Sequence, residues 1–411
     1  MPSERIVMIN DTSVGRGGAT GLAVLAAKEL VNRGRDVTFL VGDAGENSDL
    51  NGSGVNLWGA GGCHITKQGA AHALINGLYN KSGLSALADW IEQNDRPDTV
   101  YHVHGWSKIW SPGLFRALRP VQVRLVIHAH DFFLACPNGA FWHYDKRETC
   151  ELRPLGVRCL KAGCDRRSKA QGLWRAARTG LLRQFLSPQD ISPNILLIHP
   201  AMKTGFGTSG YADERLKVVR NPVVPFCAMP ISASKNKKIA FVGRLNPEKG
   251  ALVLAKACQK ANIPLMVLGE GPEESAVAQT GAEMYGWCDR DTIAKLLKDA
   301  RLLVMPSQYP EPFGLVAVEA LGSGLPVVVP DTALLAHEIT SSGAGASVDC
   351  TDETALAETL GRLSRNDQSI VEMSQQALVI APELGLSLSA WLDELEASYA
   401  FTLRASQEAT R

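Results

Sequence analysis

The segment Ile239-Ala-Phe-Val-Gly-Arg-Leu-Asn-Pro-Glu-Lys-Gly250 sets an apolar run directly before a loop that carries two basic residues. Residues 239–242 are strand-like, and Arg244 and Lys249 lie on the loop that follows. Open α/β sheets bind their ligands beyond the carboxyl ends of their strands. For this segment taken alone, a solvated charged loop is the favoured explanation, so its meaning depends on the residues around it.

A second segment, residues 310–321 (Pro-Glu-Pro-Phe-Gly-Leu-Val-Ala-Val-Glu-Ala-Leu), follows a strand-like run at 302–305. Glu311 precedes a predicted helix, and Glu319 is expected two turns inside it. The free N–H groups near residues 313–315 would face an anion such as a diphosphate. A surface carboxylate is the alternative for Glu319, but its apolar neighbours predict a buried group, which needs a partner.

Strand-like and helix-like runs alternate along the whole chain, which predicts an α/β protein with mostly parallel sheets. The stretch 222–238 contains three prolines and is predicted as an interdomain linker. We therefore expect two Rossmann-like, doubly wound domains, at 1–222 and 223–385, with a C-terminal helix in 386–411 that packs back on the first. The predicted strands are 5–9, 36–41, 99–103, 123–127, 195–198, 239–242, 265–268, 302–305 and 326–329, and the predicted helices are 19–32, 252–261, 290–300, 315–321 and 390–404.

The 411 residues are 45% apolar and 20% charged, which is the composition of a globular protein with room for two cores. The 42 basic residues balance 42 acidic ones, which argues against a nucleic-acid partner. The sequence starts without the pattern of a secretory signal and contains no apolar run of about 18 residues, so a cytoplasmic protein is predicted.

These segments resemble glycosyltransferase family 4, a large group of retaining enzymes with the GT-B fold. The family's Gly-Arg-Leu…Lys-Gly loop matches 243–250, its Gly-x-Gly-Pro turn matches 269–272, and its Glu-x7-Glu signature matches Glu311 and Glu319. A Gly-Leu-Pro-Val-Val strand start follows at 324–328. The resemblance implies two domains that face each other across a cleft, where a nucleotide diphosphate sugar of the UDP or GDP type binds.

The resemblance also assigns roles within the donor site. Arg244 and Lys249 hold the diphosphate, and Glu319 accepts hydrogen bonds from the ribose. Glu311 contacts the transferred sugar and counts as a catalytic residue. Fixed cations and a helix N-terminus would stabilise the departing diphosphate without a metal, so no catalytic cofactor is expected. Three residues of the helix start complete the donor site: Phe313, Gly314 and Leu315.

The loop Gly15-Arg-Gly-Gly-Ala after the first strand is a weak signal by itself, since such turns also serve ordinary packing of strand against helix. A dehydrogenase would use an acid near Asp43, but the Gly-x-Gly-x-x-Gly pattern fails at Thr20. By resemblance, Gly17 and Gly18 let the backbone approach the donor phosphates and the acceptor.

The run His128-Ala-His-Asp131 follows another predicted strand. Its two histidines could form a metal pair, but no third ligand is evident, and the metal site stays unknown. By resemblance, His130 contacts the donor sugar and Asp131 helps the acceptor hydroxyl lose its proton. His102 and His104 could serve packing or acceptor contact.

The family alone implies retention, and no carboxylate is identified for a double displacement, so a same-face reaction is favoured. The predicted activity is metal-independent hexosyl transfer to a hydroxyl of a glycan or lipid-linked acceptor, in polysaccharide biosynthesis. The alternatives are a sugar-nucleotide epimerase or hydrolase of the same fold and a non-catalytic nucleotide-binding protein.

The stretch 132–183 is longer and richer in Cys and Arg than the family requires. Four of the nine cysteines fall within it without a Cys-x2-Cys pair. They could hold a structural zinc ion, form disulfides or remain free thiols. The four are Cys136, Cys150, Cys159 and Cys164.

Residues 146–183 contain eleven basic residues against three acidic ones. Arg175, Arg178 and Arg183 alternate there with apolar residues, which suits an amphipathic helix on an anionic membrane surface. We therefore predict a peripheral protein at the inner face of the membrane. Packing of the apolar side against the first domain is the alternative. The apolar residues are Leu173, Trp174, Ala177, Leu181, Leu182 and Phe185.

Overall fold

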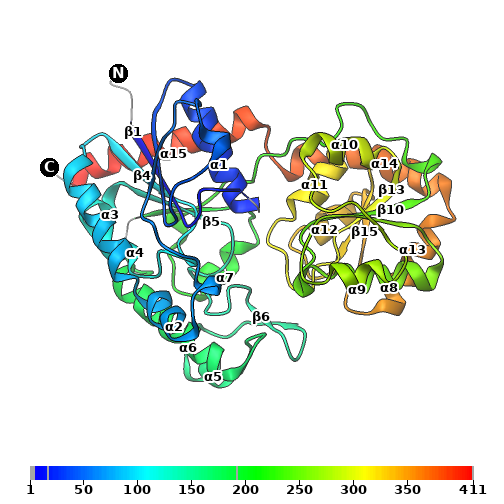
Figure 1. Cartoon of the computed structure of the whole chain (residues 1–411), viewed down its shortest axis with the longest axis horizontal. Helices are drawn as coiled ribbons and strands as arrows, with labels where there is room; N and C mark the ends of the chain where they lie inside the picture. Colours follow the sequence, from blue (N-terminus) through cyan, green and yellow to red (C-terminus); the bar gives the residue numbers. More distant parts are fainter. Residues whose placement is uncertain (1–4, 16–17, 191–192, 410–411) are drawn as a thin grey trace. The chain divides into compact units, whose positions relative to one another are not determined.

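The computed structural model describes residues 5–15, 18–190 and 193–409. The chain folds into two compact units. Unit 1 comprises Met1–Val219 and Leu392–Arg411, and unit 2 comprises Arg220–Trp391. Each unit is built around one parallel β-sheet with helices on both faces (Figure 1). None of the helices in the described ranges is long and apolar enough to cross a membrane.

Unit 1 contains a seven-stranded sheet in the order β3-β2-β1-β4-β5-β8-β9. The chain starts in the middle of this sheet, builds outward to β3, and then crosses to the other side of β1, so the strand order reverses between β1 and β4. Every residue of β1 and β4 is buried, as expected for parallel strands that are covered on both faces. The strands are β1 (Arg5–Asn10), β2 (Asp36–Val41), β3 (Asn56–Gly59), β4 (Thr99–Val103), β5 (Leu125–Ala129), β8 (Asn194–Leu197) and β9 (Leu216–Val218).

Helices and one small hairpin complete unit 1. The predicted strand 123–127 begins only at Leu125, because a 3-10 helix with Pro120 in its first turn occupies Arg119–Arg124. The other elements are α1 (Gly18–Asn32), α2 (Ala70–Leu78), α3 (Lys81–Asn94), α4 (Leu114–Ala117), β6 (Trp142–His143), β7 (Glu148–Thr149), α5 (Val157–Lys161), α6 (Lys169–Phe185), α7 (Met202–Thr208) and short 3-10 turns at Ser48–Leu50, Ile65–Lys67 and Asp213–Arg215.

The C-terminal helix α15 (Leu388–Ala409) starts in unit 2 and continues into unit 1. Glu396 pairs with Arg33 and Arg35 at 2.7 Å each. Leu395 and Tyr399 are fully buried. The last helix of the sequence therefore completes the core of the first unit.

Unit 2 contains a six-stranded sheet in the order β12-β11-β10-β13-β14-β15, and its strand order reverses between β10 and β13. This is the arrangement of a doubly wound Rossmann-like sheet. The strands are β10 (Lys238–Val242), β11 (Leu265–Leu268), β12 (Glu283–Met284), β13 (Ala300–Val304), β14 (Val327–Pro330) and β15 (Gly345–Val348).

The helices of unit 2 cover both faces of this sheet. Helix α8 packs with α13 on one face, and α11 packs with α14 on the other (Figure 1). The predicted helix 290–300 ends at Leu297, because Ala300 already begins β13. The helices are α8 (Ala251–Ala261), α9 (Glu274–Ala278), α10 (Arg290–Leu297), α11 (Leu315–Gly322), α12 (Ala336–Ser341), α13 (Glu353–Ser364) and α14 (Asp367–Leu384), with 3-10 turns at Ala233–Lys235 and Pro247–Lys249.

Candidate active site

The loops that leave β10 and β13 lie where the strand order of unit 2 reverses, which is where such sheets bind ligands. The first loop ends at Gly250, whose φ of +71° is left-handed. A Cβ added there would lie 2.0 Å from the carbonyl oxygen of Pro306. The Gln308 N–H donates to the Glu248 carbonyl at 2.9 Å. A backbone hydrogen bond thus joins the two loops. Only glycine fits at position 250, where the loops approach most closely.

Lys249 and Glu311 form an ion pair between these loops, with Nζ 2.7 Å from Oε2. The Ser307 hydroxyl donates to the same carboxylate oxygen at 2.8 Å, and Lys249 Nζ donates to the Tyr309 hydroxyl at 3.0 Å. Burial alone would raise the pKa of Glu311, but the charge of Lys249 and these hydrogen bonds hold that pKa below its usual value. Glu311 is therefore an anion beside a cation that can also bind a phosphate.

Helix α11 begins directly after Gly314, which caps it with a left-handed φ of +75°. A Cβ on Gly314 would meet the Met305 sulfur at 2.7 Å, and Phe313, at 3% exposure, anchors the turn in the core. The N–H groups that start at Leu315 have no partner within the helix and carry the positive end of its dipole. This helix start therefore offers free N–H groups, and its predicted binding of an anion stays a prediction.

Glu319 lies one turn inside α11, rather than two, and its partner is Arg290. The Arg290 NH1 atom is 2.8 Å from the carboxylate, and its other terminal nitrogen donates to the carbonyls of Val224 and Pro225. Burial raises the pKa of Glu319, and the charge of Arg290 opposes that rise. Arg290 is a candidate site residue that the sequence marked only as a helix start.

Arg244 is exposed on the loop after β10 and makes no hydrogen bond or ion pair with another described residue. Its loop is held by the neighbouring turn, since the Leu245 N–H donates to the Glu270 carbonyl at 2.9 Å. The guanidinium group is therefore free to bind an anion while its backbone is fixed.

In unit 1 the strand order reverses between β1 and β4, and Asp11 joins the loops that leave these two strands. Its carboxylate accepts hydrogen bonds from the N–H groups of Lys108, Ile109 and Trp110 at 2.7–3.1 Å. Asp43 accepts two hydrogen bonds from Ser13, so the acid that a dehydrogenase would use fixes the loop after β1 instead.

The sequence predicts that Gly17 and Gly18 let the backbone of this loop approach a ligand. Gly17 lies outside the described residues, and Gly18 is the exposed first residue of α1. The predicted approach of the Gly18 backbone to a ligand stays a prediction.

His130 and Asp131 follow β5 directly. The Nε2 atom of His130 lies 3.0 Å from Nδ1 of His104, and burial lowers the His130 pKa to about 4. The Asp131 carboxylate accepts a hydrogen bond from the Phe133 N–H at 2.9 Å, and burial raises its pKa to about 6. Near pH 7 these two groups are thus a neutral imidazole and a carboxylate that is poised to accept a proton.

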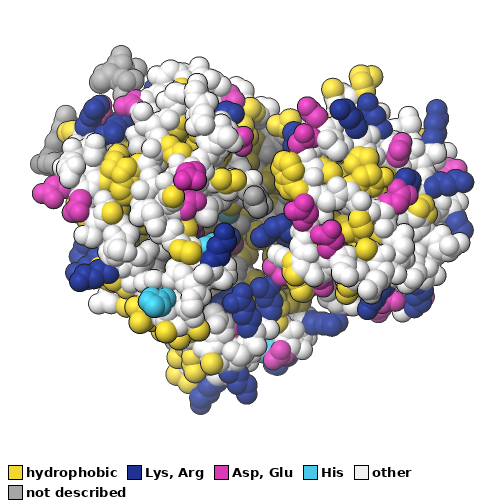
Figure 2. All heavy atoms as spheres, viewed as in Figure 1, with side chains coloured by type: hydrophobic (Ala, Val, Ile, Leu, Met, Phe, Trp, Pro, Cys, Tyr) yellow, Lys and Arg dark blue, Asp and Glu magenta, His cyan; other side chains and the backbone are white. Residues whose placement is uncertain are grey.

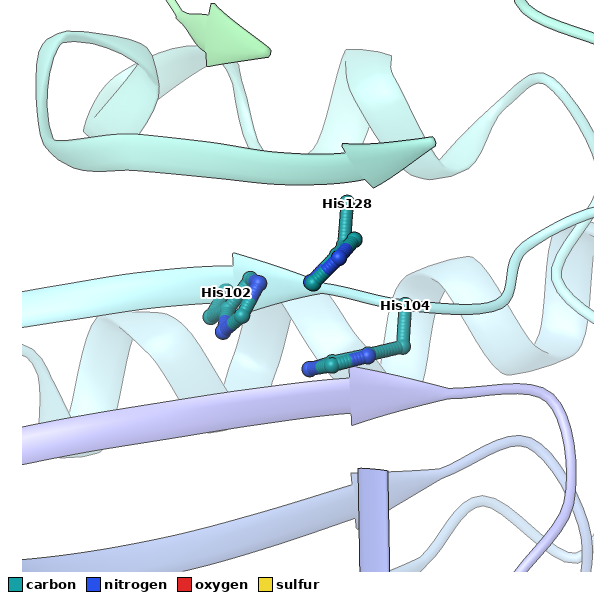
Figure 3. Close-up of side chains that lie close together, drawn as sticks. All are labelled: His102, His104 and His128. Atoms are coloured by element: carbon teal, nitrogen blue, oxygen red, sulfur yellow. The ribbon is translucent and has the colours of Figure 1, made fainter. Parts of the chain in front are cut away.

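His102, His104 and His128 surround one point at the ends of β4 and β5 (Figure 3). One ring nitrogen from each lies within 4.8 Å of the others, so the group takes only His128 from the predicted pair and does not include His130. His102 Nδ1 is 2.7 Å from the Tyr399 hydroxyl. Burial lowers the pKa of all three histidines well below the usual value, which keeps them neutral. The group could hold a metal ion, and through His104 it also positions His130.

Helix α6 corrects the prediction that its arginines face a membrane. Arg178 is 8% exposed, lies over the ring of Trp174 and donates to the Ser107 carbonyl at 2.7 Å. Arg175 pairs with Asp165 at 3.1 Å, and Arg183 is half-buried. These side chains pack against unit 1 because their long apolar stems cover its surface while their charges find protein partners.

Comparison with known proteins identifies the domain that carries the first of these sites. Residues 230–378, which lie within unit 2, match the family model described as Glycosyl transferases group 1. Unit 2 contains a glycosyl transferases group 1 domain. Lys249, Arg290, Glu311 and Glu319 all belong to this domain, whereas the histidine group belongs to unit 1.

Two relatives illustrate how far the similarity extends. An uncharacterised 42.6 kDa protein in the cps region of Klebsiella pneumoniae is 23% identical over 75% of this chain and 79% of its own length. A D-inositol 3-phosphate glycosyltransferase of Mycolicibacterium smegmatis is 30% identical over 41% of this chain and 39% of its own length. The chain therefore matches well under half of that named glycosyltransferase.

The crystal structure of Anabaena HepE in complex with UDP resembles the chain over its full length, covering 96% of this chain and 99% of HepE. The TM-score is 0.65 at 17% sequence identity, a likeness that concerns the fold. The GT-B fold predicted from the sequence is thereby confirmed.

Proposed function

We propose that the chain is a retaining hexosyltransferase of family 4. It transfers a sugar from a nucleotide diphosphate sugar to a hydroxyl of a glycan or lipid-linked acceptor, in polysaccharide biosynthesis. The observation that carries this proposal is the charged cluster of the group 1 domain, where the Lys249 loop and the α11 N-terminus adjoin the partly buried carboxylates Glu311 and Glu319. Unit 2 is the donor domain in this proposal, and unit 1 serves the acceptor.

The donor is proposed to be of the UDP or GDP type, and HepE was crystallised with UDP. Arg244 and Lys249 bind its diphosphate together with the N–H groups of α11. Glu319, held by Arg290, accepts hydrogen bonds from the ribose hydroxyls. When the diphosphate displaces Glu311 from Lys249, the Glu311 carboxylate becomes available to the hydroxyls of the sugar.

The reaction breaks the bond between the anomeric carbon and the diphosphate and forms a bond to the acceptor oxygen on the same face. Negative charge grows on the leaving diphosphate, and Arg244, Lys249 and the helix start stabilise it without a metal. The acceptor proton passes to the leaving phosphate, with assistance from Asp131, while neutral His130 contacts the sugar.

A panel of UDP- and GDP-hexoses tests this function, with release of the nucleotide and transfer to glycan or lipid-linked acceptors measured together. We expect acceptor-dependent release and a product that keeps the anomeric configuration. Consumption of donor without acceptor would favour the epimerase or hydrolase, and nucleotide binding without any turnover would favour the non-catalytic protein.

Two variants test the proposed donor site. Arg244→Ala and Glu311→Gln should each lower transfer by about a hundredfold or more, because each removes a fixed group from the charged centre. The matched control is Arg362→Ala, which removes an exposed arginine from α13 in the same unit. If Arg244→Ala and Glu311→Gln transferred sugar as fast as the control Arg362→Ala, the donor site would be refuted.

We also propose that unit 1 docks on an anionic membrane at the cytoplasmic face. Three neighbouring helices expose apolar side chains, with Leu74 and Ile75 on α2, Val157 on α5 and Leu173 on α6 between 52% and 70% exposed. Figure 2 shows basic and apolar side chains side by side over α5 and α6. Exposed basic residues of the same region are Arg158, Lys161, Arg166, Arg167 and Lys169.

Sedimentation with lipid vesicles tests the docking surface. Each basic residue near an anionic surface contributes about 1 kcal/mol, so binding should need anionic lipid and weaken as salt rises. Replacing Arg158, Lys161 and Arg166 by Glu should abolish it, whereas the same change at the exposed residues Lys235, Lys237 and Lys256 of unit 2 should not. Equal binding to neutral and anionic vesicles would exclude the surface.

A further inference from the structure

Four cysteines from the segment between β5 and α6 line one cavity of about 290 Å³. The regular structure of this segment amounts to two strands of two residues each and the five-residue helix α5. A segment with so few packed elements gains little stability from its own core, and small folds of this kind are commonly held by a metal or by disulfides. The four are Cys136, Cys150, Cys159 and Cys164.

The surroundings of the sulfur atoms suit metal-bound thiolates. The Asn138 side chain contacts two of them. Its Nδ2–H group donates to Cys164 Sγ at 3.3 Å, as it would to a thiolate, and its Oδ1 atom accepts from the protonated Cys136 thiol at 3.2 Å. Donors of this kind orient a ligand and stabilise its negative charge.

The charges around the cavity complement four thiolates and one divalent cation, which together carry two negative charges. Lys161, Lys169 and Arg175 line the cavity together with Asp165, which pairs with Arg175 at 3.1 Å, and the charge of Arg183 acts on Cys159. Lys161, Lys169 and Arg183 thus supply positive charge near the cavity beyond the Arg175–Asp165 pair, whereas Arg178 donates to Ser107 away from it.

We propose that Cys136, Cys150, Cys159 and Cys164 bind one structural zinc ion. All four side chains line the same cavity. Zinc–sulfur bonds of about 2.3 Å would draw the four sulfurs together across the cavity, and each thiol gives up its proton to solvent on binding. All nine cysteines are free thiols in the structure, so no disulfide among described residues competes for the four.

The ion would also support the segment that carries His130 and Asp131. The Cys136 N–H donates to the Phe132 carbonyl at 2.7 Å, and the Phe132 N–H donates to the Gly139 carbonyl at 3.2 Å. Fixing Cys136 therefore fixes the turn directly after Asp131. This zinc site stands apart from the proposed donor chemistry, so it can be tested whether or not the protein transfers a sugar.

Elemental analysis of the full chain, purified without chelators, is the first test. We expect one zinc per chain, and the Cys150→Ser and Cys159→Ser variants should lose it. The matched control is Cys63→Ser, at an exposed cysteine of unit 1 outside the cluster, which should keep it. Wild-type protein with zinc well below one per chain would overturn the proposal.

Thiol labelling of the wild type covers the case in which a serine variant fails to fold. Zinc should protect the four cysteines from alkylation until a chelator is added, whereas Cys63 should react at once. Cobalt in place of zinc should give the charge-transfer absorption of cobalt–thiolate bonds. Alkylation that a chelator leaves unchanged, disulfides among the four, or zinc that depends on His102 and persists in Cys159→Ser would each refute the site.

Discussion

Glu319 shows which properties of a single residue the surrounding sequence predicts and which it does not. Its apolar neighbours in the sequence predict a buried carboxylate that needs a partner, and the structure supplies Arg290 at 2.8 Å. The partner lies on another helix, so spacing along the chain could not identify it. Burial raises the pKa of Glu319, and the charge of Arg290 at the start of α10 opposes that rise.

Arg290→Met should lower the free energy of unfolding by about 1–3 kcal/mol at pH 7, because it leaves the mostly buried Glu319 carboxylate without its cation. The folded-state pKa of Glu319 is raised, so the folded state holds the proton more tightly than the unfolded state. The loss should therefore shrink as the pH falls through that pKa.

Urea unfolding of unit 2, followed by hydrogen exchange, measures this effect. The control is the double variant Arg290→Met with Glu319→Gln, which removes the charge as well and should recover most of the loss. A loss that stays constant from neutral to acidic pH would contradict the account.

Asp131 should control the acidic side of the pH–rate profile. Its pKa is raised to about 6 by burial, and only the deprotonated carboxylate can assist loss of the acceptor proton. We expect kcat/KM to fall as the pH falls below about 6 and Asp131→Asn to lose that dependence together with most activity. The control is Asp89→Asn, at an exposed acid of α3. A flat profile in the wild type would remove Asp131 from the mechanism.

At the level of elements, the loop after β10 owes its shape to contacts with two neighbouring loops. A Cβ on Gly269 would lie 1.8 Å from the Gly243 carbonyl oxygen, as tight as the contact between Gly250 and Pro306. The glycines that match the family's motifs are therefore the points where three strand-end loops touch. Arg244 and Lys249 are presented between these contacts.

Gly250→Ala should destabilise unit 2 and weaken nucleotide binding. Alanine in a left-handed conformation costs about 1–2 kcal/mol, and the clash with Pro306 adds to that cost. Gly281→Ala is the matched control, since Gly281 has a φ of +87° in the same unit but no atom within 4 Å of an added Cβ. Thermal unfolding measures the stability of both variants. Equal losses of stability would mean that the loop containing Pro306 can move to accommodate the added Cβ.

Helix α6 shows the limit of periodicity as an indicator of function. The alternation of arginine with apolar residues correctly predicts an amphipathic helix, but it does not say what the helix faces. The structure buries Arg178 at 8% exposure and leaves Leu173 at 59%. The helix thus turns its arginines toward the protein and leaves Leu173, one of the apolar residues predicted to face a membrane, exposed to solvent.

At the scale of the whole molecule, the end of the chain stabilises its beginning. The residues Leu392–Arg411 belong to unit 1, where Tyr399 reaches His102 Nδ1 at 2.7 Å. The C-terminal helix therefore links the proposed acceptor-side unit to the last segment of the sequence.

Leu395→Ala should lower the stability of unit 1 by about 2–5 kcal/mol, because it leaves a cavity at a fully buried position. Phe401→Ala is the control, since Phe401 lies on the same helix with 55% exposure. Hydrogen exchange resolved by peptide should show the loss across β1 and β4 in the first variant alone. Loss confined to α15 would mean that the helix is not integral to unit 1.

The sequence by itself determined the α/β class, the two doubly wound sheets and the candidate residues from Arg244 to Glu319. These depend on local periodicity and on short motifs, in which neighbours along the chain are also neighbours in space. The sequence also raised the zinc and membrane proposals, which stay predictions.

Only the tertiary structure decided which groups meet across the fold. It paired Glu319 with Arg290 and Lys249 with Glu311, brought His102 and His104 beside His128, and turned the arginines of α6 inward. These contacts join residues on different strands, helices and loops, and burial at each site sets the charge that a side chain carries. A linear pattern holds no information about that burial, so these features required the folded chain.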